Sequence, residues 1–400
     1  MITRTKYYKS GIREQFRSGN VLIDAMVTHY MAKPLLGQEP YWTPNAQRSF
    51  WISAALLFVF PVLVYLASLI NFGFALAASY VAAVVMTGLF RKFQVEYGHH
   101  ASHRSFVRGN REKNNLYLNL STTIALCQNG IEYRKEHNEH HDRSIFTTED
   151  DADAALLRKF GFRPGLSRKR LWLTLIANLF SPYFHVYFFW QRLKSSFVTR
   201  STWAWRIASA AWLTFVCSGG FFLPLWIAAV TIWLPLTIFY QMSALIQFVT
   251  EHAWMITETA PTSNETYAER CWGRFMGERL PESSGSLFAK AIAWSGFAIR
   301  HVFLHFPGRY AIVVGDMPAH DWHHLAGYLG VPGHNWPAGI YERQRAIEAG
   351  DKLRMAEREL WGVIPMINHI FIVMEHALPR AIVEADMEIG LQNIPVAAGE

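Results

Sequence analysis

The sequence predicts an all-α integral membrane protein in which four transmembrane helices form two hairpins and a cytoplasmic helical cap carries three histidine clusters. Three observations lead to this prediction: an apolar composition, two long stretches without charge, and short histidine spacings just outside those stretches. Of the 400 residues, 51% are hydrophobic and 17% are charged. Soluble domains contain about 25% charged residues, so a bilayer explains the shortfall.

The two uncharged stretches run from Ser49 to Phe90 and from Ile207 to Thr250. Each is about twice the roughly 20 residues that cross a hydrocarbon core, so each predicts one helix that crosses and a second that returns. Residues 71–73 and 217–220 contain the Asn and Gly that tolerate the backbone angles of helix ends, and we expect the turns there.

Basic residues flank the two hairpins, and they predict the orientation. The flanking residues are Arg4, Lys6, Lys9, Arg13, Arg17, Lys33, Arg48, Arg91, Lys92, Arg104 and Arg108. By the positive-inside rule these ends face the cytoplasm, which places all three histidine clusters on the cytoplasmic side. The net charge of +7 fits a surface against anionic lipid better than a nucleic-acid binder, because the basic residues gather beside the hairpins.

Two further apolar segments bear on this topology. The stretch from Leu171 to Trp190 is long enough to span, and a fifth crossing would place His137 and His320 on opposite faces. We expect it to be interfacial or buried in the protein, because polar residues interrupt it and basic residues flank both ends. The segment from Leu360 to Val373 is too short to cross comfortably and is expected along the interface.

Other features of the chain mainly exclude alternatives. Cys127, Cys217 and Cys271 form no C-x-x-C pair, which argues against a disulfide framework and a thiolate iron–sulfur site. The polar start of the chain predicts no cleavable signal peptide. We expect a basic cytoplasmic arm at residues 1–48, a membrane and metal-binding region at 49–330, and a C-terminal helical extension, cytoplasmic or interfacial, at 331–400.

The histidine clusters predict a metal site. Their members are His99 and His103, then His137, His140 and His141, and last His320, His323 and His324. Imidazole binds borderline metals such as iron, zinc and copper, and helical residues three or four apart share one face. One zinc ion needs about four ligands, so eight clustered histidines indicate two metals.

These clusters resemble the three histidine boxes of the membrane fatty acid desaturase superfamily. The resemblance is carried by Glu96–Arg104, Arg134–His141 and His320–Leu325, and it extends over roughly residues 50 to 330. The superfamily also includes alkane hydroxylases, xylene monooxygenase and carotenoid ketolases. The resemblance implies a non-haem di-iron centre that uses two Fe ions and O2 as co-substrate.

The same resemblance implies a ninth ligand, His252, because members often carry a glutamate–histidine pair just after the fourth span. It also matches residues 147–153 to an acidic segment that commonly follows the second box, although a solvated loop is an equal alternative. No cytochrome b5 signature is attached to the chain. The resemblance therefore implies an external electron donor, such as ferredoxin, rubredoxin or cytochrome b5 with its reductase.

Neighbours of the boxes are candidates for supporting roles. His100 points about 100° around a helix from His99, so we expect it behind the ligands and not among them. Four carboxylates could accept hydrogen bonds from ligand imidazoles or could simply face solvent. They are Glu136, Glu139, Asp142 and Asp321.

Three functions remain open from the sequence. The first is a desaturase that acts on a fatty acyl group or lipid. The second is a hydroxylase or ketolase, a monooxygenase that acts on a hydrocarbon, terpenoid or other lipophilic metabolite. Box spacings differ from those of acyl-CoA desaturases and of alkane hydroxylases, so the resemblance does not transfer a substrate. The third is a non-catalytic membrane metal receptor or transporter, which would place polar residues within the spans.

Overall fold

The computed structural model describes residues 11–42, 45–200, 202–255, 260–282, 285–327 and 336–377. The structure is 71% helical with almost no strand, which confirms the all-α class. Two short strands, β1 (Gly273–Phe275) and β2 (Glu359–Trp361), pair in parallel with Gly273 opposite Glu359. This pairing joins the C-terminal part of the chain to the segment that follows the second predicted hairpin.

The helices are as follows in chain order. In the first half they are η1 (Arg13–Phe16), α1 (Val21–Met31), α2 (Ala46–Ile70), α3 (Phe72–Lys92), η2 (Phe93–Gly98), α4 (His99–Ser102), α5 (Arg111–Ile124), α6 (Gly130–His140), α7 (Ala152–Lys159), α8 (Arg168–Leu179), α9 (Pro182–Lys194) and η3 (Ser195–Thr199). In the second half they are α10 (Trp203–Phe222), α11 (Leu225–Ala228), η4 (Ala229–Trp233), α12 (Leu234–Leu236), α13 (Ile238–Glu251), α14 (Asn264–Ala268), α15 (Leu287–Arg300), η5 (His301–His305), η6 (Gly308–Ile312), η7 (Met317–Ala319), α16 (His320–Leu325), η8 (Trp336–Ala338), α17 (Gly339–Glu348), η9 (Met355–Glu357) and α18 (Val363–His376).

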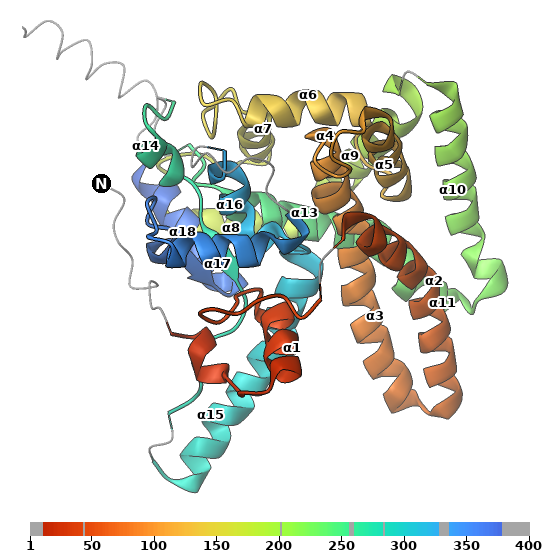
Figure 1. Ribbon diagram of the computed structural model, residues 1–400. Helices are drawn as coiled ribbons and strands as arrows, with labels where there is room; N and C mark the ends of the chain where they lie inside the picture. Colours follow the sequence, from red (N-terminus) through yellow and green to blue (C-terminus); the bar gives the residue numbers. More distant parts are fainter. Residues whose placement is uncertain are drawn as a thin grey trace, which may run out of the picture.

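Helices α2 and α3 form the first hairpin (Figure 1). Asn71 lies between them in an extended conformation (φ −169°, ψ 171°), and its side chain accepts a hydrogen bond of 3.0 Å from the backbone N–H of Phe74. One residue therefore ends α2 and caps α3, as expected of an N-cap asparagine. The turn predicted at residues 71–73 is confirmed.

The second uncharged stretch forms α10 on one side and a returning path through α11, η4, α12 and α13 on the other (Figure 1). The turn predicted at residues 217–220 is wrong, because α10 continues to Phe222 and the chain turns at the following Leu223 and Pro224. Gly220 serves close packing instead: a Cβ there would lie 3.0 Å from side-chain atoms of Leu225 and Trp233. Its lack of a side chain lets the returning segment approach α10.

Four helical segments are long and apolar enough to cross a membrane: Ala46–Ile70, Phe72–Ser102, Leu225–Glu251 and Leu287–Ile312. Their number agrees with the prediction, and three of them lie in or extend the two uncharged stretches. The fourth was not expected, because basic residues interrupt its sequence, whereas α10 is not among the four. None of the most apolar part of Leu287–Ile312 is buried inside the protein. An apolar environment around this segment would satisfy its exposed side chains.

The stretch from Leu171 to Trp190 forms two separate helices, α8 and α9, which break at Phe180 and Ser181. With 12 and 13 residues, each is too short to cross a hydrocarbon core. This finding agrees with the prediction that the stretch does not span.

The segment from Leu360 to Val373 is not interfacial as predicted. Its helix α18 packs against α8 and α13, and the side chains of Met366, Ile370 and Phe371 are fully buried. The segment belongs to the largest apolar core of the protein. Apolar residues cover most of the circumference of α18, which is typical of a core helix and not of a surface helix with one solvent-exposed face.

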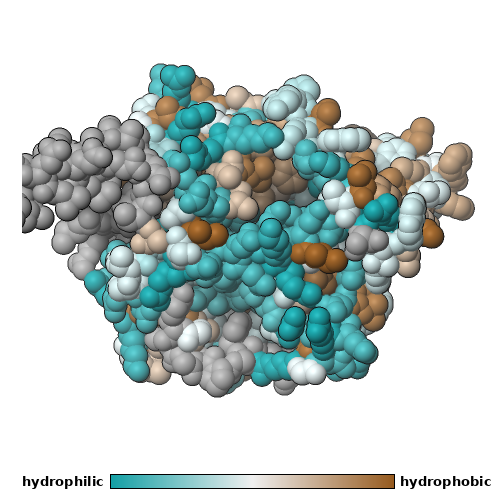
Figure 2. Space-filling model, turned by 90° about the horizontal axis from the view of Figure 1, so that it is seen from above, coloured by the Kyte–Doolittle hydropathy of each residue, from teal (hydrophilic) through white to brown (hydrophobic). Residues whose placement is uncertain are grey.

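The helices that carry the histidines lie together at one end of the molecule. Figure 1 shows α4, α6 and α16 above the long apolar helices α2, α3 and α15. Seen from that end, the surface is largely hydrophilic, with smaller hydrophobic areas (Figure 2). The fold therefore joins a membrane-spanning part to a water-facing cap, and the histidines lie in the cap.

Candidate metal centre

Four segments bring the nine candidate histidines together. His99 opens α4, a continuation of α3, and His103 ends it, while His252 directly follows α13. The remaining six lie on or next to α6 and α16: His137, His140, His141, His320, His323 and His324. The structure divides the nine into a five-histidine group and a four-histidine group.

The five-histidine group consists of His99, His103, His137, His141 and His323. The Nε2 atoms of His99 and His323 are 2.8 Å apart, and those of His323 and His103 are 3.2 Å apart. The Nε2 atoms of His137 and His141 are 3.1 Å apart. All members except His99 are partly exposed, so this group reaches toward the surface of the cap.

The four-histidine group consists of His140, His252, His320 and His324, all of them buried. Nε2 of His140 lies 3.2 Å from that of His252, and Nε2 of His324 lies 3.0 Å from that of His320. The ring of His324 stacks on His141 of the other group, with centroids 4.1 Å apart. The two groups are therefore in direct contact.

The spacing of these nitrogens fits metal coordination. Ligand nitrogens about 2.1 Å from one ion are separated by about 3.0 Å in an octahedral arrangement and about 3.4 Å in a tetrahedral one. The observed Nε2 separations of 2.8 to 3.2 Å fall close to this range. Imidazole suits iron, zinc and copper, so each group could hold one ion of this kind.

Asp151 orients the ring of His140 through a contact at Nδ1. Its Oδ2 lies 2.8 Å from Nδ1 of His140, and the carboxylate also accepts backbone hydrogen bonds from Thr147 and Asp153. These bonds make Asp151 the N-cap of α7. Because Nδ1 donates to the carboxylate, Nε2 of His140 is free to face an ion. The acidic run at residues 147–153 thus contacts the site and is not a solvated loop.

Two of the other three buried imidazoles have neutral partners, whereas Nε2 of His320 lies 3.2 Å from Oε1 of the Glu251 carboxylate. The hydroxyl of Tyr267 lies 2.8 Å from Nδ1 of His324. Nδ1 of His252 lies 3.3 Å from the backbone oxygen of Arg270. The backbone oxygen can only accept, so its contact places the proton of His252 on Nδ1 and leaves Nε2 for a metal, whereas the Tyr267 hydroxyl orients the ring of His324 as donor or acceptor. No sequence pattern indicated Tyr267, which is far from every box in the chain.

Burial keeps most of these imidazoles neutral. It lowers the pKa of His137, His141, His252, His320 and His324 well below the ordinary value. The neutral form is the one that binds metals.

His140 is different. Burial also opposes its charge, but the nearby Asp151 carboxylate outweighs burial and raises the pKa of His140 to about 9. At neutral pH a metal ion must therefore displace a proton from this imidazole.

The four carboxylates beside the boxes contact other groups and not the ligand imidazoles. Their partners are Gln128 for Glu136, Lys135 for Glu139, Ser144 for Asp142 and Arg343 for Asp321. Of the two alternatives left open for them, hydrogen bonds to ligand imidazoles are therefore not found. A residue next to a ligand on a helix points about 100° away from it, so its side chain cannot reach behind that ligand.

His100 stands apart from both groups, as the helix geometry predicted. Its Nε2 lies 2.7 Å from Asp316, and its ring stacks on Trp336 with centroids 4.2 Å apart. It also contacts the ring of His323 at a centroid distance of 5.3 Å. His100 thus supports the ligand region without entering it.

A further potential ligand set lies away from this centre. Glu278, His301 and His305 bring one ligand atom each within 4.8 Å of the others. Arg300 already binds both carboxylate oxygens of Glu278, at 2.8 and 3.0 Å, which opposes binding of a cation there. His334 lies outside the described residues.

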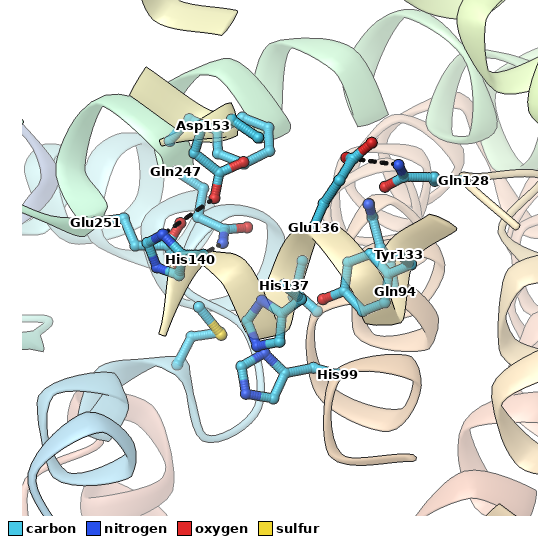
Figure 3. Close-up of a pocket in the computed structure, with 14 residues that line it drawn as sticks. Gln94, His99, Gln128, Tyr133, Glu136, His137, His140, Asp153, Gln247 and Glu251 are labelled. Carbon is cyan, nitrogen blue, oxygen red and sulfur yellow. Dashed lines mark hydrogen bonds and ion pairs between the residues drawn. The ribbon is translucent and has the colours of Figure 1, made fainter. Parts of the chain in front are cut away.

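A cavity of about 70 Å³ adjoins both histidine groups (Figure 3). His99 and His137 of the five-histidine group and His140 of the four-histidine group line it. The ring of Tyr133 stacks on His137, with centroids 5.4 Å apart and planes 4° apart. Among the described residues, the Tyr133 hydroxyl has no hydrogen-bond partner. A substrate in this cavity would lie beside both groups.

An all-α membrane fold with nine clustered histidines defines a class of protein, the helical membrane proteins with a histidine-rich candidate metal centre. A family comparison then specifies it: residues 75–279 match the fatty acid desaturase family, and the chain belongs to that family. No curated protein and no solved structure gives a significant match. The chain is thus a desaturase-like oxidoreductase and an integral membrane protein. Family membership favours an enzyme over the non-catalytic metal receptor.

Proposed function

We propose that this chain is an O2-dependent membrane di-iron oxidoreductase that introduces a double bond into a fatty acyl group or lipid. The observation that supports the proposal is the convergence of nine histidines into two adjoining groups beside one cavity. All nine, His99, His103, His137, His140, His141, His252, His320, His323 and His324, are proposed as iron ligands. Bound iron would supply the reaction of O2 that removes hydrogen from an unactivated carbon.

The chain's own residues prepare the site for this chemistry. Burial keeps His252, His320 and His324 neutral and able to ligate. Asp151 fixes Nδ1–H of His140, so that Nε2 faces the neighbouring His252. Removal of water from the four-histidine group protects a reactive site from side reactions. The adjoining cavity would hold one carbon of the substrate close to the ligands.

The partly exposed five-histidine group would be the point of electron entry. It lies in the cap, whose surface is largely hydrophilic (Figure 2). A soluble or membrane-attached electron-transfer protein could approach this face. We propose ferredoxin, rubredoxin or cytochrome b5, each with its reductase, as the donor.

We propose that the cap faces the cytoplasm. Basic residues at the cap ends of the hairpins support this orientation through the positive-inside rule. Reporters inserted after Asn138 and after Glu357 should both report the cytoplasm, and a reporter after Phe72 the opposite side. Placement of Asn138 and Glu357 on different faces would refute the shared-site topology.

The reaction is tested by lipid mass spectrometry of cells that express the wild type or His140→Ala with a donor and reductase supplied. A product that lacks two hydrogens, present only with the wild type, is expected. His140→Ala should lose iron while the protein stays in the membrane. As a matched control, His376→Ala on α18 should retain iron and product, because His376 is exposed and bonds only its own helix. Full iron and turnover in His140→Ala would refute the shared site.

A hydroxylase or ketolase is the second candidate, favoured by the polar side chains around the cavity. It would act on a lipophilic metabolite that itself carries a polar group. The same mass spectrometry separates the two, because this candidate predicts a product that gains one oxygen.

A further inference from the structure

We propose that a cavity between the first hairpin and the cap binds one phospholipid of the surrounding bilayer, with the phosphate at Arg48 and an acyl chain along α2 and α3. The cavity has a volume of about 430 Å³, within the range of roughly 300–1,000 Å³ that is typical of pockets for small ligands. It shares no lining residue with the cavity beside the histidines. The proposed site is therefore separate from the metal centre and does not depend on the proposed reaction.

Several elements that are distant in the chain enclose this cavity. Its lining comes from α1, the cap ends of α2 and α3, η6 and α17. Figure 1 shows α1 and α17 on the same side of the hairpin that α2 and α3 form. A molecule inside the cavity would contact the hairpin and the cap together, whereas a lipid that coats one helix would contact the hairpin alone.

The part of the cavity beside the hairpin is apolar. Ile52 and Leu56 line it from α2, and Val85 and Leu89 line it from α3. Ile52 and Leu56 follow Arg48 by four and eight residues, so they lie on one face of α2 and about 6 and 12 Å further along it. Ile52 is also 53% exposed, so the cavity opens toward the outer surface of the hairpin. This wall favours a hydrocarbon chain that enters from the bilayer.

Basic side chains line the cap end of the same cavity. They are Arg48, Lys92 and Arg309. Lys92 forms an ion pair of 3.3 Å with Glu96. The guanidinium of Arg309 donates to backbone oxygens of three residues: His29, Val313 and Gly315. The side chain of Arg48 is exposed, and it has no hydrogen-bond or ion-pair partner among the described residues.

Two carboxylates also line the cavity, and both have partners. Glu96 pairs with Lys92, and Oδ2 of Asp316 lies 2.7 Å from Nε2 of His100. Within the part of the chain that the structure describes, neither carboxylate forms an ion pair with Arg48 or with the buried guanidinium at residue 309. Arginine keeps its charge at any ordinary pH, so the cap end offers a positive charge to an anion.

A phospholipid combines the two groups that this cavity matches. The planar guanidinium of Arg48 can donate two parallel hydrogen bonds to one phosphate. Lipid phosphates lie just outside the hydrocarbon core, and Arg48 lies in the first turn of an apolar helix, at the same level. Tyr41 and Trp42 line the cavity and are 55% and 63% exposed, which is typical of aromatic side chains at a membrane interface.

The test is native mass spectrometry of the full-length protein in detergent. Phosphatidylglycerol, the diacylglycerol with the same chains, or oleate is added at equal concentration. We expect one phosphatidylglycerol molecule to be retained per chain, and about tenfold less of either other lipid, because the diacylglycerol lacks the phosphate and oleate has one chain and no phosphate. Equal retention of the diacylglycerol would overturn the phosphate contact. Preferred retention of oleate would overturn the assignment of a phospholipid.

Two variants connect the retained lipid to this cavity. Arg48→Glu should reduce retention of phosphatidylglycerol by about tenfold, because a carboxylate repels the phosphate. Leu56→Trp should reduce it as well, because the larger side chain fills the apolar part. The matched controls are Arg111→Glu and Val62→Trp, which make the same kinds of change at exposed residues outside the cavity. Full retention in either cavity variant, or an equal loss in the controls, would refute the assignment.

Thermal unfolding gives a second readout. A lipid that binds the folded hairpin and cap together stabilises the folded state, so added phosphatidylglycerol should raise the unfolding temperature of the wild type and of Arg111→Glu. The increase should be absent in Arg48→Glu. An equal increase in Arg48→Glu would contradict the inference. Neither readout needs iron or turnover, so failure of the proposed reaction would leave both results unchanged.

Discussion

Asp151→Asn should change the number of protons that metal binding releases. In the wild type, the Asp151 carboxylate lies 2.8 Å from Nδ1 of His140, and both side chains are buried, with exposures of 0% and 3%. The carboxylate raises the pKa of His140 to about 9 in the absence of metal. His140 is then protonated at pH 7, and an ion that binds its Nε2 must release that proton.

The size of this effect follows from the pKa. A difference of about two units between pH 7 and the pKa of His140 corresponds to about 2.7 kcal/mol, or about a 100-fold weaker apparent affinity. Asp151→Asn removes the strongest of the contributions that raise the pKa of His140, while burial still lowers this pKa and Asp153 and Glu251 still raise it. The proton penalty at pH 7 is then smaller. Loss of the orienting carboxylate acts in the opposite direction and weakens intrinsic metal affinity by about 10- to 100-fold.

The two effects are separated by measurement across pH. Near pH 9.5, where the wild type carries little proton penalty, Asp151→Asn should bind Fe2+ about 10- to 100-fold more weakly. At pH 7 the two proteins should differ much less. Anaerobic calorimetry in buffers of different ionisation enthalpy should find about one proton released per pair of ions by the wild type at pH 7 and a smaller number by the variant.

A control variant and the pH dependence of stability without metal provide two checks on this reasoning. Asp142→Asn should behave as the wild type, because Asp142 contacts Ser144 and no ligand imidazole. In the metal-free protein, the pKa of His140 is raised on folding, so its stabilisation is fully present below about pH 6.5 and is lost as the pH rises to about 9. Equal proton release by Asp151→Asn and the wild type would contradict the reasoning.

Two further predictions concern other contacts. Tyr267→Phe removes the hydroxyl 2.8 Å from Nδ1 of His324, so iron affinity should fall by about tenfold in chelator titrations while thermal unfolding changes little. Gly88→Ala would place a Cβ 1.6 Å from the backbone oxygen of Tyr310, so thermal unfolding should show a loss of about 2 kcal/mol or more from the packing of α3 against η6. Gly327→Ala is its control, because no atom lies within 4 Å of the added Cβ, and an equal loss there would contradict the packing argument.

The sequence by itself determined the fold class and the candidate ligands. Uncharged stretches and regular spacings are local properties. A helix satisfies its backbone hydrogen bonds within one segment, and its side-chain periodicity can be recognised from neighbouring residues. His137, His140 and His141 could therefore be assigned to one helix end before any contact was known. The grouping of the nine histidines agrees with that expectation, although their role as ligands stays a proposal.

Only the tertiary structure decided which histidines share a group. His140 belongs with the distant His252 and not with its neighbour His141, because α6 turns them to different sides. The same holds for the supporting contacts: Asp151 and Tyr267 reach ligands from elements that chain order does not bring close. Tertiary structure also corrected two predictions from local patterns. Helix α18 lies in an apolar core and not at the interface, and α15 belongs to a long apolar segment although basic residues interrupt its sequence. Spacing along the chain fixes directions on one helix, whereas contacts between helices depend on how the whole chain packs.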